Sequence, residues 1–306
     1  MFFLIDLVPQ LDLTPIYAHY ERETRGAPPF DVAMMTTLLV YAYCVGVFSS
    51  RKMAAACERN VAFLAIVGQQ RPDFRSISDF RKIHLDALAG LFVEVLQIAG
   101  ELGLVKLGNL ALARLERAGQ CFAAQGDELR LYDKGSRTAA DLTAAANDQQ
   151  QAAPLGQQTK ENLAAAGIER PTAEDGSPAA IPLSADTGYF SAENVGQLES
   201  QGFDPYIATG RQQHNQGLPS GIADNDQPGP DATAKQRMSH TLRTESGRAR
   251  YAKRKHIVAP VFGQIKQARG FRQFLLRGLP KVRGEWKLVC LTHNLLKIWR
   301  YRYALS

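Results

Sequence analysis

The sequence predicts a mixed α/β protein in which a helical N-terminal bundle precedes an α/β domain with a depleted sheet. Apolar residues recur at intervals of three and four through the first hundred residues, which is the period of amphipathic helices. Later, LSADTGYFSAENVGQLESQGFDPYIATGR has the pattern of a strand, a helix and a strand, an order typical of layered α/β folds. We therefore expect residues 1–105 to form a helical domain and residues 106–306 an α/β domain.

The helical domain is expected to begin with a strand or turn and a short helix in residues 1–27. PPFDVAMMTTLLVYAYCVGVFSS then predicts a helix that begins at two prolines and ends near Gly46. SSRKMAAACERN predicts a second helix, and NVAFLAIVG a third that ends at Gly68. A longer helix follows an Arg-Pro-Asp turn, with Ser76 or Ser78 as its N-cap.

The longer helix has three basic residues, Arg75, Arg81 and Lys82, which we expect to be exposed. Short helices, a tight turn and a basic helix are compatible with helix-turn-helix DNA binding. The alternative is that these charges form an ordinary solvated face, and the helical pattern by itself leaves both interpretations open.

The α/β domain begins with KLGNLAL, residues 106–112, which predicts the start of a strand. The segment from about 113 to 136 has mixed charges and no strand alternation, and we interpret it as a deletion or frame disturbance. The sheet of this domain should consequently contain fewer strands than a domain of this length could form.

The central part of this domain has clearer patterns. Residues 183–185 and 205–208 are predicted strands, and between them Ser191 caps a helix that Gly202 ends. Residues 210–240 are rich in Gln, Gly, Asp and Pro with few large apolar side chains, so we expect a loop or disordered insertion there.

Positive charge is concentrated near the C-terminus. From Lys235 onward there are 18 Lys or Arg residues and two acids, so half of the chain's 36 basic residues lie in its last quarter. With a net charge of +6 and a pI near 9.1, this favours a nucleic acid over a membrane surface as partner. Two helical patterns run through residues 253–299, and His293 is expected to be a core or capping residue of the second.

The cysteines and apolar runs indicate a cytoplasmic protein. No CxxC-type pair is present, and widely separated cysteines in apolar contexts are typical of free thiols in a reducing compartment. The first residues lack the basic leader and cleavage site of a signal peptide. The longest other apolar run is shorter than the roughly 20 residues that span a bilayer. The four cysteines are Cys44, Cys57, Cys121 and Cys290.

Both ends of the chain resemble one known family. VFGQIKQARGFRQFLLRGLPKVRGEWKLVCLTHNLLKIW resembles the C-terminal part of bacterial insertion-sequence transposases of the DDE class. PPFDVAMMTTLLVYAYCVGVFSSRKMAAACERNVAFLAIVGQQRPDFRSISDFRKIH is similar to the helical N-terminal domain of the same family. The resemblance implies an RNase H-like fold for residues 106–306, DNA binding by residues 1–105, and Mg²⁺-dependent strand transfer between element ends and target DNA.

The resemblance also identifies the positions of the three metal-binding carboxylates. Two aspartates and one glutamate hold a pair of Mg²⁺ ions in the family, and ADTGYFSAENV places Asp186 at the second aspartate. Ala113 and Ala259 stand at the other two positions. Because a methyl group cannot ligate a cation, we expect Mg²⁺ binding to be weak or absent. Without the resemblance, an isolated aspartate such as Asp186 is more commonly an ordinary turn residue or a residue that precedes a helix; the match of the whole run favours the metal-binding interpretation.

Three other residues could in principle replace the missing ligands. Asp133 and Asp141 lie near the disturbed segment, and His256 precedes Ala259 by three residues on a predicted helix. Imidazole is a poor ligand for Mg²⁺, which prefers oxygen. We do not expect these groups to rebuild the site.

Basic and aromatic residues flank the position of Ala259. The resemblance implies that they contact DNA phosphates near the cleavage point, whereas their spacing alone is equally typical of helix-surface charge. These residues are Tyr251, Arg254, Lys266, Arg269 and Arg272.

We therefore expect a degenerate DDE transposase that binds DNA without cutting it, with homo-oligomerisation left open. One alternative is an inert DNA-binding regulator that competes with an active transposase for element ends. Another is a remnant without a role. Binding to defined terminal repeats would separate these two alternatives.

Overall fold

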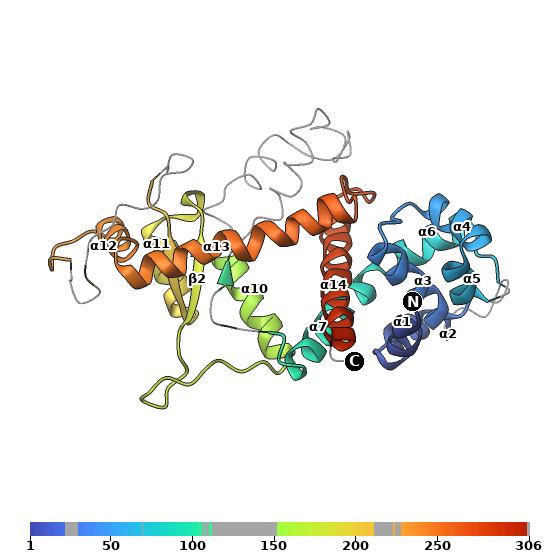
Figure 1. Ribbon diagram of the computed structural model, residues 1–306, viewed down its shortest axis with the longest axis horizontal. Coiled ribbons are helices and arrows are strands. Elements are labelled where there is room, and N and C mark those ends of the chain that lie inside the picture. Colours follow the sequence, from blue (N-terminus) through green and yellow to red (C-terminus); the bar gives the residue numbers. More distant parts are fainter. Residues whose placement is uncertain are drawn as a thin grey trace. The chain divides into compact units, whose positions relative to one another are not determined.

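The computed structural model describes residues 1–21, 30–68, 70–105, 107, 110–111, 152–210, 223 and 228–304. They are mostly helical with a small parallel sheet, in agreement with a mixed α/β class (Figure 1). They form two compact units, a helical unit of residues 1–104 and 263–304 and a sheet unit of residues 105–262. The helical unit thus includes a C-terminal segment that a single boundary at 105 would assign elsewhere.

The N-terminal part of the helical unit contains seven α-helices and one 3-10 turn among its described residues. The predicted helices at α3, α4 and α5 are confirmed, with side-chain caps from Asp31 on α3 and Asn60 on α5. The elements are α1 (Phe2–Leu7), η1 (Val8–Gln10), α2 (Thr14–Glu21), α3 (Val32–Cys44), α4 (Ser50–Arg59), α5 (Val61–Val67), α6 (Phe74–Ile83) and α7 (Leu85–Glu101). The strand or turn expected at the start is wrong, because residues 2–7 are helical.

The longer helix predicted after Gly68 is two helices, α6 and α7. Asp73 caps α6, since its Oδ1 accepts the backbone N–H groups of Arg75 at 2.7 Å and Ser76 at 2.8 Å, so neither predicted serine is the N-cap. The helices meet at His84. Within the described ranges no single helix is long and apolar enough to cross a membrane, although α6 and α7, bent by 69°, meet that length and composition as a pair.

The C-terminal segment completes the core of the helical unit. It contains the short π-helix η4 (Gln264–Ala268) and α14 (Leu279–Ala304), which packs along α7 and α3 (Figure 1). A Cβ at Gly284 would lie 2.6 Å from Cγ of Leu85, so this helix crossing requires glycine. Leu288 and Leu291 are fully buried against the N-terminal helices. Residues nearly 200 positions apart therefore share one core.

A buried polar network joins three helices of this core. Glu285 on α14 is fully buried, and its Oε1 accepts a hydrogen bond from the Tyr43 hydroxyl at 3.0 Å. Its Oε2 accepts the backbone N–H groups of Leu275 at 2.9 Å and Leu276 at 3.0 Å. Arg81 on α6 donates to the Tyr43 hydroxyl at 3.1 Å. Burial raises the pKa of Glu285, while these donors and the Arg81 charge oppose the shift.

The sheet unit is built on three parallel strands in the order β1-β2-β3. The central strand is buried along its whole length, and Leu183 pairs with Leu110 on one side and Pro205 on the other. The elements are β1 (Leu110–Ala111), α10 (Ala152–Ala165), β2 (Ile181–Ala185), η3 (Thr187–Tyr189), α11 (Ala192–Ser200), β3 (Phe203–Ile207), α12 (Ala234–Thr241) and α13 (Glu245–Gly263).

The predicted strand-helix-strand run is confirmed by β2, α11 and β3. Ser191 caps α11 as predicted, its Oγ accepting the N–H of Asn194 at 3.0 Å. The loop expected over residues 210–240 is wrong at α12, because Thr233 and Gln236 form a reciprocal capping box that starts a helix. The segment of about 113–136 lies outside the described residues, so its interpretation stays a prediction.

Buried histidines and thiols lie in the helical core. His293 is 4% exposed, which confirms the predicted core position, and burial lowers its pKa to about 4. Burial likewise lowers the pKa of His84, whose Nε2 lies 2.9 Å from the Tyr20 hydroxyl, to about 4. Cys44 and Cys57 are free and buried, as expected, with the thiol pKa of Cys57 raised to about 11.

We expect Glu285→Ala to lower the free energy of unfolding by about 3–5 kcal/mol, because it removes one partner of a buried charged network. Lys287→Ala, at an exposed position on the same helix, should change it by less than about 0.5 kcal/mol. Urea denaturation followed by circular dichroism measures both. Equal effects of the two substitutions would show that the network contributes nothing.

Acidification should destabilise the helical unit. The folded pKa of His84 and His293 is about 4, whereas the unfolded value is about 6.5, so the unfolded chain binds more protons between these pH values. Their contribution is complete above pH 6.5 and is lost as pH falls towards 4. The urea midpoint should therefore decrease between pH 7 and pH 5. His293→Gln should make this decrease smaller, while the control substitution His240→Gln, on α12 of the sheet unit, should leave it unchanged. An identical slope in both variants would contradict the assignment.

Candidate functional site

Asp186 directly follows the central strand β2 and precedes η3. Because β1, β2 and β3 are parallel, their carboxyl ends meet at one edge of the sheet, which is where α/β proteins place their functional residues. The Asp186 side chain is 32% exposed. Thr187 donates to the Gly210 carbonyl at 2.9 Å and fixes the turn beside it. The predicted position of Asp186 at the end of a strand is therefore confirmed.

One face of α13 is attached to this edge of the sheet. Arg254 donates a hydrogen bond to Asp186 Oδ1 and forms an ion pair with it. Its guanidinium carbon lies 5.1 Å from the ring centroid of Tyr251, which is 7% exposed and whose pKa burial raises. One turn earlier, Arg250 lies 5.7 Å from the ring centroid of Tyr206 on β3. Helical spacing puts these α13 residues side by side.

Among the described residues, the donor set at this edge does not fit a pair of Mg²⁺ ions. Such a pair needs several carboxylates that converge. In the part of the chain that the structure describes, no three His, Cys, Asp or Glu side chains lie together as metal ligands. The Asp186 carboxylate is engaged by Arg254, and Ala259 on α13 has no oxygen to offer.

The remaining positions of the predicted metal site cannot be compared with this geometry. Ala113, Asp133 and Asp141 lie outside the described residues, as does the side chain of His256. Whether Asp133, Asp141 or His256 could replace a missing ligand therefore stays a prediction.

Two family models match separate parts of the chain. Residues 3–83 match a family described as transposase domain (DUF772), and residues 228–299 match the transposase DDE domain. Together they cover half of the chain. The chain belongs to the insertion-sequence transposases of the DDE class. Comparisons with curated proteins and with solved structures gave no match. The DDE match contains Ala259 and α13, whereas Asp186 lies outside both matched segments.

The predicted DNA contacts of this transposase on α6 differ in exposure. Arg75 and Lys82 are exposed, and Lys82 lies 3.3 Å from Asp79. The expected exposure of Arg81 is wrong, since its side chain is 4% exposed and donates to the Phe48 carbonyl at 2.9 Å and to Tyr43. Arg81 thus stabilises the core and is not placed to contact DNA.

A second predicted contact, Arg269, is also buried. It is 8% exposed and donates to Thr292 Oγ1 at 2.7 Å and to the Val289 carbonyl at 3.1 Å, and burial lowers its pKa. In this structure Arg269 is therefore held in the core and is not placed to contact DNA. Lys266 is partly exposed and Arg272 is exposed, so both remain candidates for contact with DNA.

Two residues absent from the sequence-based candidates, Arg51 and Phe74, form an exposed cluster with Arg75. The signal in the sequence is the Phe-Arg pair that directly follows the capping residue Asp73. An aromatic side chain in a first helical turn, next to arginines, is unusual enough to be noticed without a structure.

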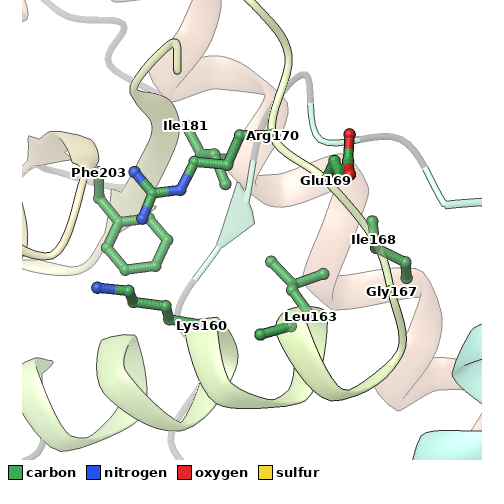
Figure 2. A pocket seen from close by; sticks show the side chains of 9 residues that line it. Lys160, Leu163, Gly167, Ile168, Glu169, Arg170, Ile181 and Phe203 are labelled. Atoms are coloured by element: carbon green, nitrogen blue, oxygen red, sulfur yellow. The ribbon is translucent and has the colours of Figure 1, made fainter. Parts of the chain in front are cut away.

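A cavity of about 370 Å³ lies at the opposite end of the sheet. Its walls include Ile181 and Phe203, the first residues of β2 and β3, and Figure 2 shows Lys160 and Arg170 beside the Phe203 ring. Arg170 donates to the Gln201 carbonyl at 2.9 Å. Because the strands are parallel, this cavity is separated from Asp186 by the length of β2 and supplies no metal ligand to it.

A double-mutant cycle should detect the ion pair. Asp186→Asn and Arg254→Gln should each destabilise the sheet unit, with a coupling energy of about 1–2 kcal/mol, because the two side chains are only 32% and 20% exposed. Asp79→Asn with Lys82→Gln is the matched control, since that pair is 61% and 48% exposed and should couple by less than about 0.5 kcal/mol. If urea denaturation gave equal coupling energies for the Asp186–Arg254 and Asp79–Lys82 pairs, a structural role for Asp186 would be contradicted.

Proposed function

We propose that the chain is a DNA transposition protein that binds DNA and does not carry out metal-dependent strand transfer. One observation supports this above all: Asp186, the single carboxylate at a matching family position, is bound by Arg254. The other two positions are Ala113 and Ala259. The parallel order of β1, β2 and β3, with Asp186 after the central strand, supports an RNase H-like arrangement for residues 106–306.

A guanidinium cannot replace the metal. In an intact relative, a Mg²⁺ pair would activate the attacking hydroxyl and stabilise the leaving oxygen. Arg254 balances the charge of Asp186, but a guanidinium has no open coordination position for a hydroxyl. A divalent ion would have to displace Arg254 from both Asp186 and the Tyr251 ring, and would gain only one carboxylate in return.

DNA is the proposed partner, at element ends and target sites. The net charge of +6 and the exposed basic residues of both matched segments support it. Assembly into homo-oligomers and a cytoplasmic location belong to the same proposal. Affinity should fall steeply with salt, because the contacts would be made to phosphates.

A regulator of active transposase is the second candidate. The buried network around Glu285 belongs entirely to the helical unit. The core of this unit therefore does not include the metal-binding position, and the proposed DNA-binding unit does not need an intact metal site in order to fold. Such a protein could occupy element ends without cutting them. Competition with an active relative for terminal repeats would distinguish regulation from a remnant without a role.

The function is tested by nicking of a labelled duplex in Mg²⁺ or Mn²⁺. We expect no cleavage by the parent protein or by Asp186→Ala, because two carboxylate positions are alanine. Ala259→Glu adds one carboxylate and should also stay inactive, since Ala113 is unchanged. The same preparations should bind the duplex in a salt-sensitive manner. Cleavage by the parent that Asp186→Ala abolishes would mean that other ligands rebuild the site.

A further inference from the structure

An exposed aromatic ring on the helical unit contacts the guanidinium groups of two arginines. Phe74 is the first residue of α6 and is 38% exposed. The guanidinium carbon of Arg51, from the first turn of α4, lies over its ring at 5.3 Å from the centroid. That of Arg75 lies over it at 5.7 Å. Both distances are within the range of a cation–π contact.

The packing of α4 against α6 brings this cluster together. Met53 and Cys57 of α4 are buried, as are Ile77 and Phe80 of α6, so the inner faces of the two helices are occupied by the core. Phe74 stands one turn before Ile77 on the same stripe but extends beyond the core. Its exposure is therefore a feature of its position at the start of the helix.

Further exposed basic residues lie close to the cluster in the sequence. Lys52, next to Arg51, and Arg71, before the capping residue Asp73, are also exposed. The partial positive charges at the starts of α4 and α6 act in the same direction. Asp73 is the acid closest in sequence, and its Oδ1 accepts the N–H groups of α6, which lower its pKa. The arrangement suits a polyanion with closely spaced charges.

A ring beneath a guanidinium restricts its motion and leaves the N–H edges accessible to an acceptor. Two arginines held on one ring are thus oriented before a ligand arrives, which reduces the entropy that binding costs. Phosphates spaced along a duplex offer acceptors to both.

We propose that Phe74 orients Arg51 and Arg75 for contact with the phosphate backbone of duplex DNA, which makes this cluster the phosphate-binding surface of the helical unit. The inference rests on the proposed DNA-binding function and assigns it to residues. It replaces the buried Arg81 with Arg51 as the partner of Arg75.

The test is binding of a fluorescent duplex across a series of salt concentrations. Arg51→Gln and Arg75→Gln should each reduce the slope of log K against log salt by about 1, since each removes one phosphate contact. Phe74→Leu should weaken binding several-fold with both charges retained, whereas Phe74→Tyr, which keeps the ring, should bind as the parent does. Arg59→Gln, at the exposed last residue of α4, is the matched control and should leave slope and affinity unchanged.

The outcomes separate the two proposals. If the parent protein does not bind duplex DNA at low salt, the proposed function is wrong. If the parent binds but Arg51→Gln and Arg75→Gln keep its slope, DNA is bound elsewhere and only this inference is overturned. Melting curves establish that each variant is folded, and if Phe74→Leu unfolds, the salt slopes of Arg51→Gln and Arg75→Gln still decide the inference.

Discussion

The helical unit depends on satisfying one buried carboxylate. Glu285 has no access to water, and an ionisable group in that situation must be hydrogen-bonded or neutralised. Its partners come from α3 through Tyr43, from the backbone at Leu275 and Leu276, and from α6 through the charge of Arg81. The network can form only when α14 lies in the N-terminal core. The N-terminal matched segment, 3–83, and residues 263–299 of the DDE match are therefore parts of one folding unit.

In the sheet unit an arginine binds a carboxylate directly, with a different consequence. Glu285 is satisfied by three donors and is shielded from solvent. Asp186 is one-third exposed and stands at the carboxyl edge of the sheet, where the proposed correspondence with the family places a metal ligand. There Arg254 balances the charge that a cation would otherwise balance. Without a metal ion, the charge of Asp186 is thus still compensated by Arg254. The same ion pair attaches α13 to the sheet.

Local patterns predicted the elements that depend on local interactions. The helices α3, α4, α5 and α11 and the strands β2 and β3 follow from periodicity and capping residues. The start of α6 was misplaced because two serines and an aspartate are all good N-caps, and geometry alone selects Asp73. The sequence run of α1 is too short for its period to distinguish a helix from a strand.

The candidate site was predictable at Asp186, whose surrounding run has a recognisable pattern, but not at its partner. Arg254 lies 68 residues away, and no local pattern connects them. Arg81 was predicted to be exposed on the general preference of charged residues for the surface. Its position four residues after the buried Ile77 places it on the inner face of α6, and the hydroxyl and carbonyl acceptors that make this acceptable come from other helices.

Because several arginines are buried or paired, the net charge of the chain overestimates the positive charge that is available to bind DNA. Counterion release depends on cations that reach phosphates, so a buried or paired arginine adds to net charge without adding to affinity. Arg81 and Arg269 are bound inside the core, and Arg254 is bound to Asp186. The 18 basic residues after position 234 therefore overstate the charge available there. If the chain binds DNA as proposed, its affinity depends more on exposed groups such as Arg272 and on the cluster around Phe74, which carries its charge at the surface.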